Sequence, residues 1–173
     1  MTAAQPEHGT DEGLGVALTT VASFQGAVQH ADDKIRTIAA LLGTLAAFVA
    51  AQLALFAKPA YGVTDNALVI VALCAFVLSN AAAGLHLFRG LTPRTGIPEH
   101  PNRFAFPSVA VHPSATCWVP EPVAAQREDA LRLARVLARL AMAKNRHVRW
   151  GLLWTAGAYF SSLVMLVAFL VSR

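Results

Sequence analysis

The sequence predicts an all-α integral membrane protein with three transmembrane helices, the first and third of which extend into the cytoplasm as a helical stalk. Charged residues make up only 14% of the 173 residues, against about a quarter in an average soluble domain. Three long windows contain no Asp, Glu, Lys or Arg: 37–57, 67–88 and 151–171. A helix of about 20 apolar residues spans a hydrocarbon core about 30 Å thick. Each window therefore predicts one membrane crossing.

The N-terminal part of the chain predicts a tail followed by a helix. Residues 1–13 are polar and slightly acidic, which is typical of a disordered tail. We expect no secretory signal peptide, because the first apolar run starts only near Thr37. Residues 14–36 predict a cytoplasmic amphipathic helix, because apolar residues recur there at helical spacing. These residues are Leu14, Leu18, Val21, Val28 and Ile35.

A short external turn is predicted between the first two spans. It comprises residues 58–66 and contains Pro59 and Gly62, which favour a turn. Ten of the fourteen Lys and Arg residues lie between Arg89 and Trp150. Cytoplasmic connections of membrane proteins carry an excess of Lys and Arg. We therefore expect a multi-pass membrane protein with a cytoplasmic N-terminus and an external C-terminus.

The chain between the second and third spans is predicted to form a loop and then a helix. Residues 89–126 hold seven prolines, which interrupt helical hydrogen bonding, so they predict a Pro-rich cytoplasmic loop. Residues 127–150 predict a basic amphipathic helix in the cytoplasm, with Leu133, Leu137 and Leu140 on one stripe. No proline separates either amphipathic segment from the span after it. Each segment and its span are therefore expected to form one long helix.

No known catalytic or metal-binding pattern occurs in the sequence. The six histidines lack metal-ligand spacing to a Cys or a carboxylate, and the chain has neither a Gly-rich phosphate loop nor a G-x-S-x-G motif. Cys74 lies in an apolar window and Cys117 in a polar loop, so both are expected to be free thiols. We expect a protein that is not an enzyme, holds no cofactor and binds no nucleic acid.

Two charged residues fall on the apolar stripes of the predicted stalk helices. Placing residues every 100° around a helix puts Asp32 on the stripe of 14–36 and Lys144 on the stripe of 127–150. Both lie shortly before a predicted span, which gives them similar depth. One hypothesis is that they form an ion pair in the seam of the stalk, because an unpaired charge there costs several kcal/mol. The alternative is that Lys144 reaches toward lipid phosphates and Asp32 is solvated.

Arginines dominate the other faces of the helix predicted at 127–150. Basic residues beside a membrane bind anionic lipid, and binding of a nucleotide phosphate is the alternative. The preceding loop adds a cation and two aromatic rings, enough to hold a phosphate and a base, although the rings could instead anchor the loop at the membrane interface. The candidate nucleotide contacts are Arg103, Phe104, Phe106, Arg135 and Arg139.

Small and polar residues within the spans predict close contacts between helices. Small residues spaced by four let helix backbones approach, and Asn80, near the middle of the second span, needs a partner on a neighbouring helix. Because three spans alone make a thin bundle, we expect a homo-oligomer in the lipid bilayer. The candidate packing residues are Gly43, Ala47, Ala51, Asn80, Gly157 and Ser161.

Five short stretches occur in a distinctive order: Ala31–Lys34, Thr92–Arg94, Asn102–Ala110, Leu133–Lys144 and Arg149–Trp150. Together they resemble the transmembrane effectors of Pycsar antiphage systems, from about residue 20 onward. The resemblance implies that a partner pyrimidine nucleotide cyclase makes cyclic CMP or cyclic UMP during phage infection. It also implies that the protein senses this messenger and damages the cell membrane, which aborts the infection. Asp32 and Lys144 match charged positions of the family, which implies a structural or gating role.

The residues themselves leave two other functions open. One is a structural or scaffolding membrane subunit, and the other is a small ion channel, in both cases without nucleotide sensing. A polar stripe along one span would favour a channel, and Thr44, Gln52 and Asn80 are too few to form one.

Overall fold

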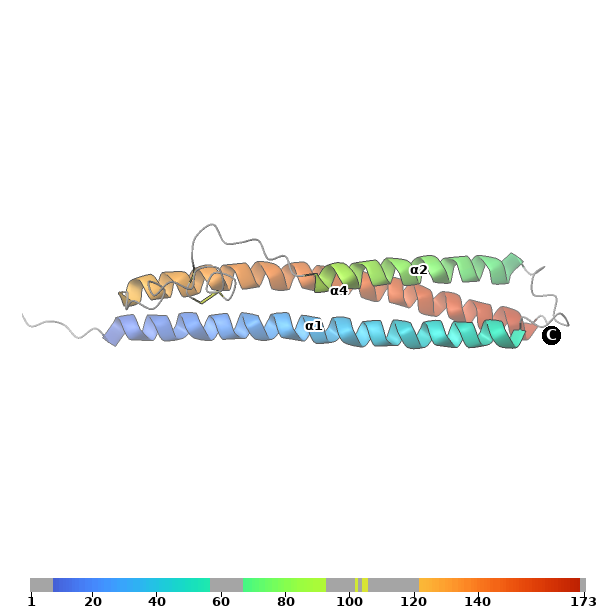
Figure 1. Ribbon diagram of the computed structural model, residues 1–173, viewed down its shortest axis with the longest axis horizontal. Coiled ribbons are helices and arrows are strands. Elements are labelled where there is room, and N and C mark those ends of the chain that lie inside the picture. Colours follow the sequence, from blue (N-terminus) through green and yellow to red (C-terminus); the bar gives the residue numbers. More distant parts are fainter. Residues whose placement is uncertain (1–7, 57–66, 93–101, 103, 106–121, 172–173) are drawn as a thin grey trace, which may run out of the picture. The chain divides into compact units, whose positions relative to one another are not determined.

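The computed structural model describes residues 8–56, 67–92, 102, 104–105 and 122–171, and the helices within these ranges are drawn in Figure 1. Helix α1 runs from His8 to Phe56, α2 from Ala67 to Leu91 and α4 from Val123 to Val171. Helices α1 and α4 each join a predicted stalk helix to a predicted span without a break, because no proline interrupts them. All three helices are long and apolar enough to cross a membrane. The predicted all-α membrane fold is therefore confirmed.

The chain divides into two compact units. One unit, called here the membrane unit, comprises residues 31–92 and 144–173, and so contains α2 with the later parts of α1 and α4. The other, called here the polar unit, comprises residues 1–30 and 93–143. It contains the earlier parts of α1 and α4.

Buried positions in the membrane unit recur alternately every three and four residues. On α1 this repeat runs from Ala31 to Gln52, and on α2 from Val69 to Ala83. An average spacing of 3.5 residues keeps one side of a helix against its neighbours over many turns. The buried apolar residues form two clusters: Leu45, Val49, Val69, Ala72, Phe76, Ala158, Met165, Ala168 and Phe169 in one, and Ile35, Ile38, Leu42, Ala83, Leu87 and Val148 in the other.

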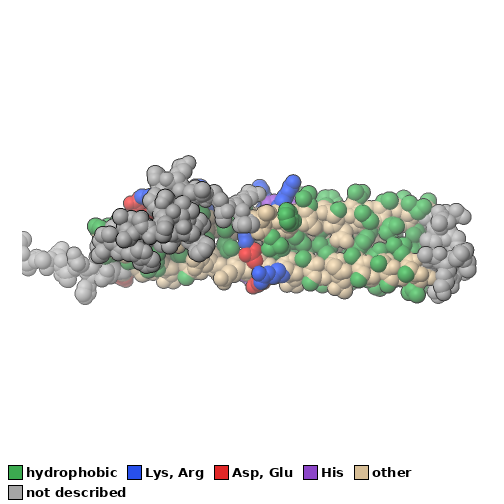
Figure 2. Space-filling model, in the orientation of Figure 1, with side chains coloured by type: hydrophobic (Ala, Val, Ile, Leu, Met, Phe, Trp, Pro, Cys, Tyr) green, Lys and Arg blue, Asp and Glu red, His purple; other side chains and the backbone are tan. Residues whose placement is uncertain are grey.

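Large apolar side chains cover the outer surface of the membrane unit. They come from all three helices and include Phe48, Leu78, Phe88, Leu153 and Phe160. Figure 2 shows hydrophobic side chains along the described part of this unit on the face in view. Lipid is the solvent that such a surface suits.

The polar unit has a smaller core made largely of alanine. Its buried apolar residues are Ala17, Val21, Ala130, Leu133 and Ala134. The side chains of Phe24 and Phe104 are partly buried against them. Small residues at these positions let α1 and α4 pack closely within this unit.

The structure corrects several predicted boundaries. Helix α1 begins at His8, so the disordered tail predicted for residues 1–13 is too long. At Gly13, α1 and α4 lie close together, since an added Cβ would lie 3.5 Å from Arg127 Cδ. The loop predicted for residues 89–126 is also too long, because α2 continues to Leu91 and α4 starts at Val123. A proline lies beside each of these two helix boundaries: Pro93 follows the end of α2 closely, and Pro122 directly precedes the start of α4.

The buried stripe of α1 agrees with the predicted one at Val21 and Ile35 and differs from it at Leu18. Leu18 is exposed, whereas the neighbouring Ala17 is buried. The prediction gave weight to the larger side chain, but a closely packed helix pair buries the smaller one.

Candidate functional site

An ion pair connects α1 and α4 in the membrane unit. Lys144 Nζ lies 2.5 Å from Asp32 Oδ1, and the two side chains are 11% and 28% exposed. The structure thus brings together the two residues that helical spacing had placed on facing stripes. Lys144 contacts a carboxylate rather than extending alone toward lipid headgroups. The neighbouring Asp33 behaves differently, because it is exposed and lies 3.6 Å from the equally exposed Arg36.

Two glycines allow the three helices to approach one another next to this ion pair. An added Cβ at Gly90 of α2 would lie 2.9 Å from Ile35 Cδ1 and 3.5 Å from His147 Cβ. An added Cβ at Gly151 of α4 would lie 2.8 Å from Leu87 Cδ2. A larger residue at either position would force a neighbouring side chain to shift.

Two histidines and a tryptophan meet in the same region. The ring centroids of His86 and His147 are 5.8 Å apart, and the His86 ring stacks on Trp150 at 6.1 Å with an interplanar angle of 18°. His147 is buried, and Trp150 is exposed on one side. We call the whole region the junction, which comprises Asp32, Ile35, His86, Leu87, Gly90, Lys144, His147, Trp150 and Gly151.

The histidine cluster of the junction could not be read from the sequence. His86 and His147 lie on different helices, and their spacing in the chain carries no signal. The one indication in the sequence that His147 faces its neighbours is its position a single helical turn after Lys144. In the part of the chain that the structure describes, no group of three or more His, Cys, Asp or Glu residues could hold a metal ion.

A hydrogen-bonded turn docks on α4 in the polar unit. Asn102 Nδ2 donates to the backbone oxygen of Asp129 at 2.9 Å, and the Phe104 amide donates to Asn102 Oδ1 at 2.9 Å. The Ala105 amide donates to the Asn102 backbone oxygen at 3.1 Å. Phe104 packs against the core of the polar unit. It therefore anchors the turn to protein, and the alternative that the aromatic rings of this loop anchor it at the membrane interface stays a prediction.

The arginines of α4 in the polar unit fall into two groups. Arg132 Nη2 lies 2.6 Å from Glu128 Oε1. This contact lowers the pKa of Glu128 below its ordinary value, first because Arg132 donates a hydrogen bond and second because its charge is positive. Arg135 and Arg139 are exposed and make no ion pair with any residue that the structure describes. Two guanidinium groups are thus available to an anion.

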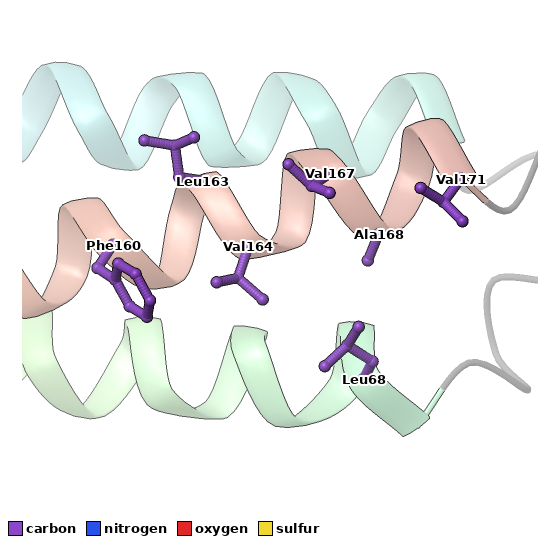
Figure 3. Close-up of a pocket in the computed structure, with 7 residues that line it drawn as sticks. All are labelled: Leu68, Phe160, Leu163, Val164, Val167, Ala168 and Val171. Carbon is purple, nitrogen blue, oxygen red and sulfur yellow. The ribbon is translucent and has the colours of Figure 1, made fainter.

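An apolar groove lies at the end of the membrane unit remote from the junction. Its volume is about 480 Å³. Figure 3 shows Val164 and Ala168 of α4 and Leu68 of α2 pointing into the space between these helices. Among the described residues, the lining consists of Leu68, Phe160, Leu163, Val164, Val167, Ala168 and Val171. The side chains of this lining are all apolar and can form no hydrogen bond to a ligand.

Comparison with models of known families decides the family. The model of the Pycsar effector protein domain (PycTM) matches residues 16–172. The chain belongs to this family. A search of curated proteins and a search of solved structures each found no significant match. The resemblance inferred from the sequence is confirmed, and the chain is a membrane effector of the Pycsar antiphage system, in which a cyclase is its partner.

The predicted packing residues of this Pycsar effector separate into two kinds. Gly157 packs within the chain, because an added Cβ there would lie 3.3 Å from Ser79 Oγ. Ser161 is buried, and its hydroxyl donates to the Gly157 backbone oxygen at 2.9 Å. In contrast, an added Cβ at Gly43 would meet nothing within 4 Å. The exposed residues, which remain available to a second copy of the chain, are Gly43, Ala47 and Ala51.

The remaining predicted residues of the Pycsar effector are Asn80, Arg103 and Phe106. Asn80 is half-buried, and its side chain makes no hydrogen bond to a described residue, so the partner predicted on a neighbouring helix is not found there. Arg103 and Phe106, two of the candidate nucleotide contacts, lie outside the described residues.

Proposed function

We propose that this Pycsar effector binds cyclic CMP or cyclic UMP, made by a pyrimidine nucleotide cyclase, and then impairs the bacterial inner membrane. The observation that carries the proposal is the continuity of α1 and α4, each of which belongs to both units. A change in packing of either helix in the polar unit can therefore reach the Asp32–Lys144 pair through helix alone. No flexible connection intervenes to absorb the change.

The exposed arginines of the polar unit support the sensing step. A cyclic nucleotide presents a phosphate charge and an aromatic base, and Arg is well suited to both. Arg135 and Arg139 are free to contact the phosphate, whereas Arg132 is held by Glu128. The other proposed contacts are Phe104, Arg103 and Phe106.

Activation is a shift between two packings of the helices. The messenger need only bind one packing more tightly than the other in order to change their populations. The close contacts at Gly90 and Gly151 favour the packing seen here, since they leave little room for intermediate positions. Asp32 and Lys144 couple the two helices at the point where they enter the membrane unit.

The distribution of charge and the exposed small residues bear on the orientation and assembly of the effector in the membrane. The excess of Lys and Arg outside the apolar windows favours a cytoplasmic N-terminus and an external C-terminus, which puts the polar unit on the side where a cyclase releases its product. The exposed small residues Gly43, Ala47 and Ala51 favour assembly of several copies in the bilayer. The effector acts without catalysis.

The test uses the purified full chain in liposomes loaded with a pH-sensitive dye and a self-quenching dye. Cyclic CMP, cyclic UMP and cyclic AMP are added separately. A change in the signal of either dye counts as impairment of the membrane. We expect one of the two pyrimidine nucleotides to cause leakage at a concentration at least 10-fold lower than cyclic AMP requires. If none of the three nucleotides causes leakage, or if all three cause it equally, the proposal is contradicted. The alternative of a structural membrane subunit without nucleotide sensing would then be favoured.

A matched pair of variants locates the sensing residues. Arg135→Gln combined with Arg139→Gln is expected to raise the required nucleotide concentration at least 10-fold. Arg132→Gln, on the same helix but held by Glu128, is expected to change it less than 3-fold. If the two changes have equal effects, the arginines act only through general charge.

A further inference from the structure

The buried polar side chains in the described part of the chain all lie in the membrane unit. They are Gln52, Ser79, His147, Ser161 and Ser162. Away from the junction, large apolar side chains cover the outer surface of the same unit. Polar side chains that face the interior of a membrane bundle commonly mark the path of water, protons or ions. The sequence of any single span holds too few polar residues to reveal such a path, because the polar side chains are distributed over three helices.

The polar side chains of α4 form a series along the membrane unit. Lys144 stands at one end with Asp32, His147 follows, and Thr155 and Ser162 continue the series. These positions share the repeat that turns one side of α4 inward. From Lys144 to Ser162 the helix rises by about 27 Å at 1.5 Å per residue, which is close to the thickness of the hydrocarbon core.

Side chains of α2 fill the gaps in this series. His86 lies against His147, with ring centroids 5.8 Å apart. Ser79 faces Gly157, where an added Cβ would lie 3.3 Å from the serine hydroxyl.

A side chain of α1 completes the series at the end remote from the junction. Gln52 lies as far along α1 from Asp32 as Val164 lies along α4 from Lys144. Because the two helices run in the same direction from the Asp32–Lys144 pair, Gln52 is level with the turn that follows Ser162. We call the complete set the polar column: Asp32, Gln52, Ser79, His86, Lys144, His147, Thr155, Ser161 and Ser162.

Gln52 is the member that packing alone explains least. It is 4% exposed, and neither its Nε2 nor its Oε1 has a hydrogen-bond partner among the described residues. An unpaired amide is costly in apolar surroundings. The hydroxyls of Thr155 and Ser161, by comparison, donate to the backbone oxygens of Gly151 and Gly157 of their own helix. Water along the column would supply the partners that Gln52 lacks.

Apolar packing closes the polar column in this structure. Ile35 and Leu87 lie against Gly90 and Gly151 in the junction, and they belong to one of the two buried apolar clusters. Separation of the helices at the junction would remove this barrier.

We propose that the polar column conducts protons and small monovalent ions once the helices separate at the junction. The inference rests on the proposed function, because it specifies how the membrane is impaired. The damage runs through the interior of the bundle, and the surrounding bilayer stays intact. Large solutes are therefore retained while the ion gradients collapse.

The test opens the junction without a nucleotide. Gly90→Val should displace Ile35, and Gly151→Ala, the second opening variant, should displace Leu87. Gly84→Val is the matched control on α2, because an added Cβ at Gly84 meets nothing within 4 Å. Folding of each variant is checked by helix content and by size in detergent. In liposomes we expect at least one correctly folded opening variant to raise proton flux at least 10-fold over wild type, with no release of calcein, and Gly84→Val to stay within 2-fold of wild type.

A second substitution in the opening variant tests the column itself. Gln52→Leu is expected to lower the proton flux at least 5-fold, while leaving the bundle folded, because it replaces an unpaired amide with an apolar group. Thr44→Leu removes a polar group from the outer surface of the same helix and should leave the flux unchanged.

Three results would overturn the inference: flux that is indifferent to Gln52→Leu, calcein release that accompanies the proton flux, or folded opening variants that conduct nothing. Each differs from failure of the proposed function, in which the wild-type protein responds to neither cyclic CMP nor cyclic UMP.

Discussion

The membrane unit and the polar unit share two helices but stabilise them in different ways. In the membrane unit the buried positions carry large residues such as Ile35, Met165 and Phe169, and in the described part of the polar unit three of the five buried apolar residues are alanines. Burying a methylene group removes it from water at a gain of about 0.8 kcal/mol, so an alanine core gains little. The polar unit instead adds a docked turn, which Asn102 holds by hydrogen bonds.

The solvent accounts for this difference. Lipid offers no hydrophobic driving force between helices, so shape, close contact and polar pairs must hold the membrane unit together. Its junction therefore concentrates glycine contacts and the Asp32–Lys144 pair. The polar unit meets water, where exposed charges are inexpensive. The same kind of interaction should thus have a large effect in one unit and a small effect in the other.

Reversal of one charge in the junction is expected to have the largest effect. Lys144→Glu sets two carboxylates against each other and should destabilise the membrane unit by about 3 kcal/mol, because one partner of a shielded pair is lost. Asp32→Lys should do the same. The combined swap should recover to within about 1 kcal/mol of wild type, as measured by thermal unfolding in detergent. Asp33→Lys, at an exposed position, serves as the control. A double variant no more stable than the singles would show that the pair does not set the contact between α1 and α4.

Truncation of the anchor of the docked turn is expected to have an intermediate effect. Phe104→Ala removes a partly buried ring from the alanine core and should destabilise the polar unit by about 1–2 kcal/mol. Hydrogen exchange should accelerate in the α4 segment 129–137 and leave the membrane unit protected. The control is Phe88→Ala, on the outer surface of the membrane unit, where lipid replaces the lost contacts. Equal effects of the two substitutions would remove the contrast between the units.

The exposed pair of Glu128 and Arg132 is expected to have the smallest effect. Arg132 holds the pKa of Glu128 below its ordinary value of 4.5. A carboxyl group whose pKa is lowered on folding adds stability at higher pH, and this stability disappears as the pH falls below 4.5 through the folded-state pKa. Arg132→Gln should return the pKa toward 4.5, as followed by NMR titration of the Glu128 carboxyl carbon. A pKa that does not move would show that the two side chains are not paired in solution.

The sequence predicts the elements of this fold well, because the uncharged windows and the lack of proline determine where helices cross the membrane and where they continue. The Asp32–Lys144 contact was also predictable, since helical periodicity relates each residue to the stripe of its own helix. The contact between His86 and His147 was not. It depends on which side of α2 faces α4, and this is set by close approach at Gly90 and Gly151, which no periodicity within one helix reveals. The buried Ala17 was missed for a similar reason, because side-chain size favours Leu18.

The seven-residue repeat of the buried positions limits how this molecule can move. A helix that slides lengthwise past its neighbour regains an equivalent fit only after seven residues, a displacement of about 10.5 Å. So long a stroke would carry several charged groups into hydrocarbon. Such a seven-residue slide is therefore costly, which favours rotation of the helices about their own axes and sideways tilting.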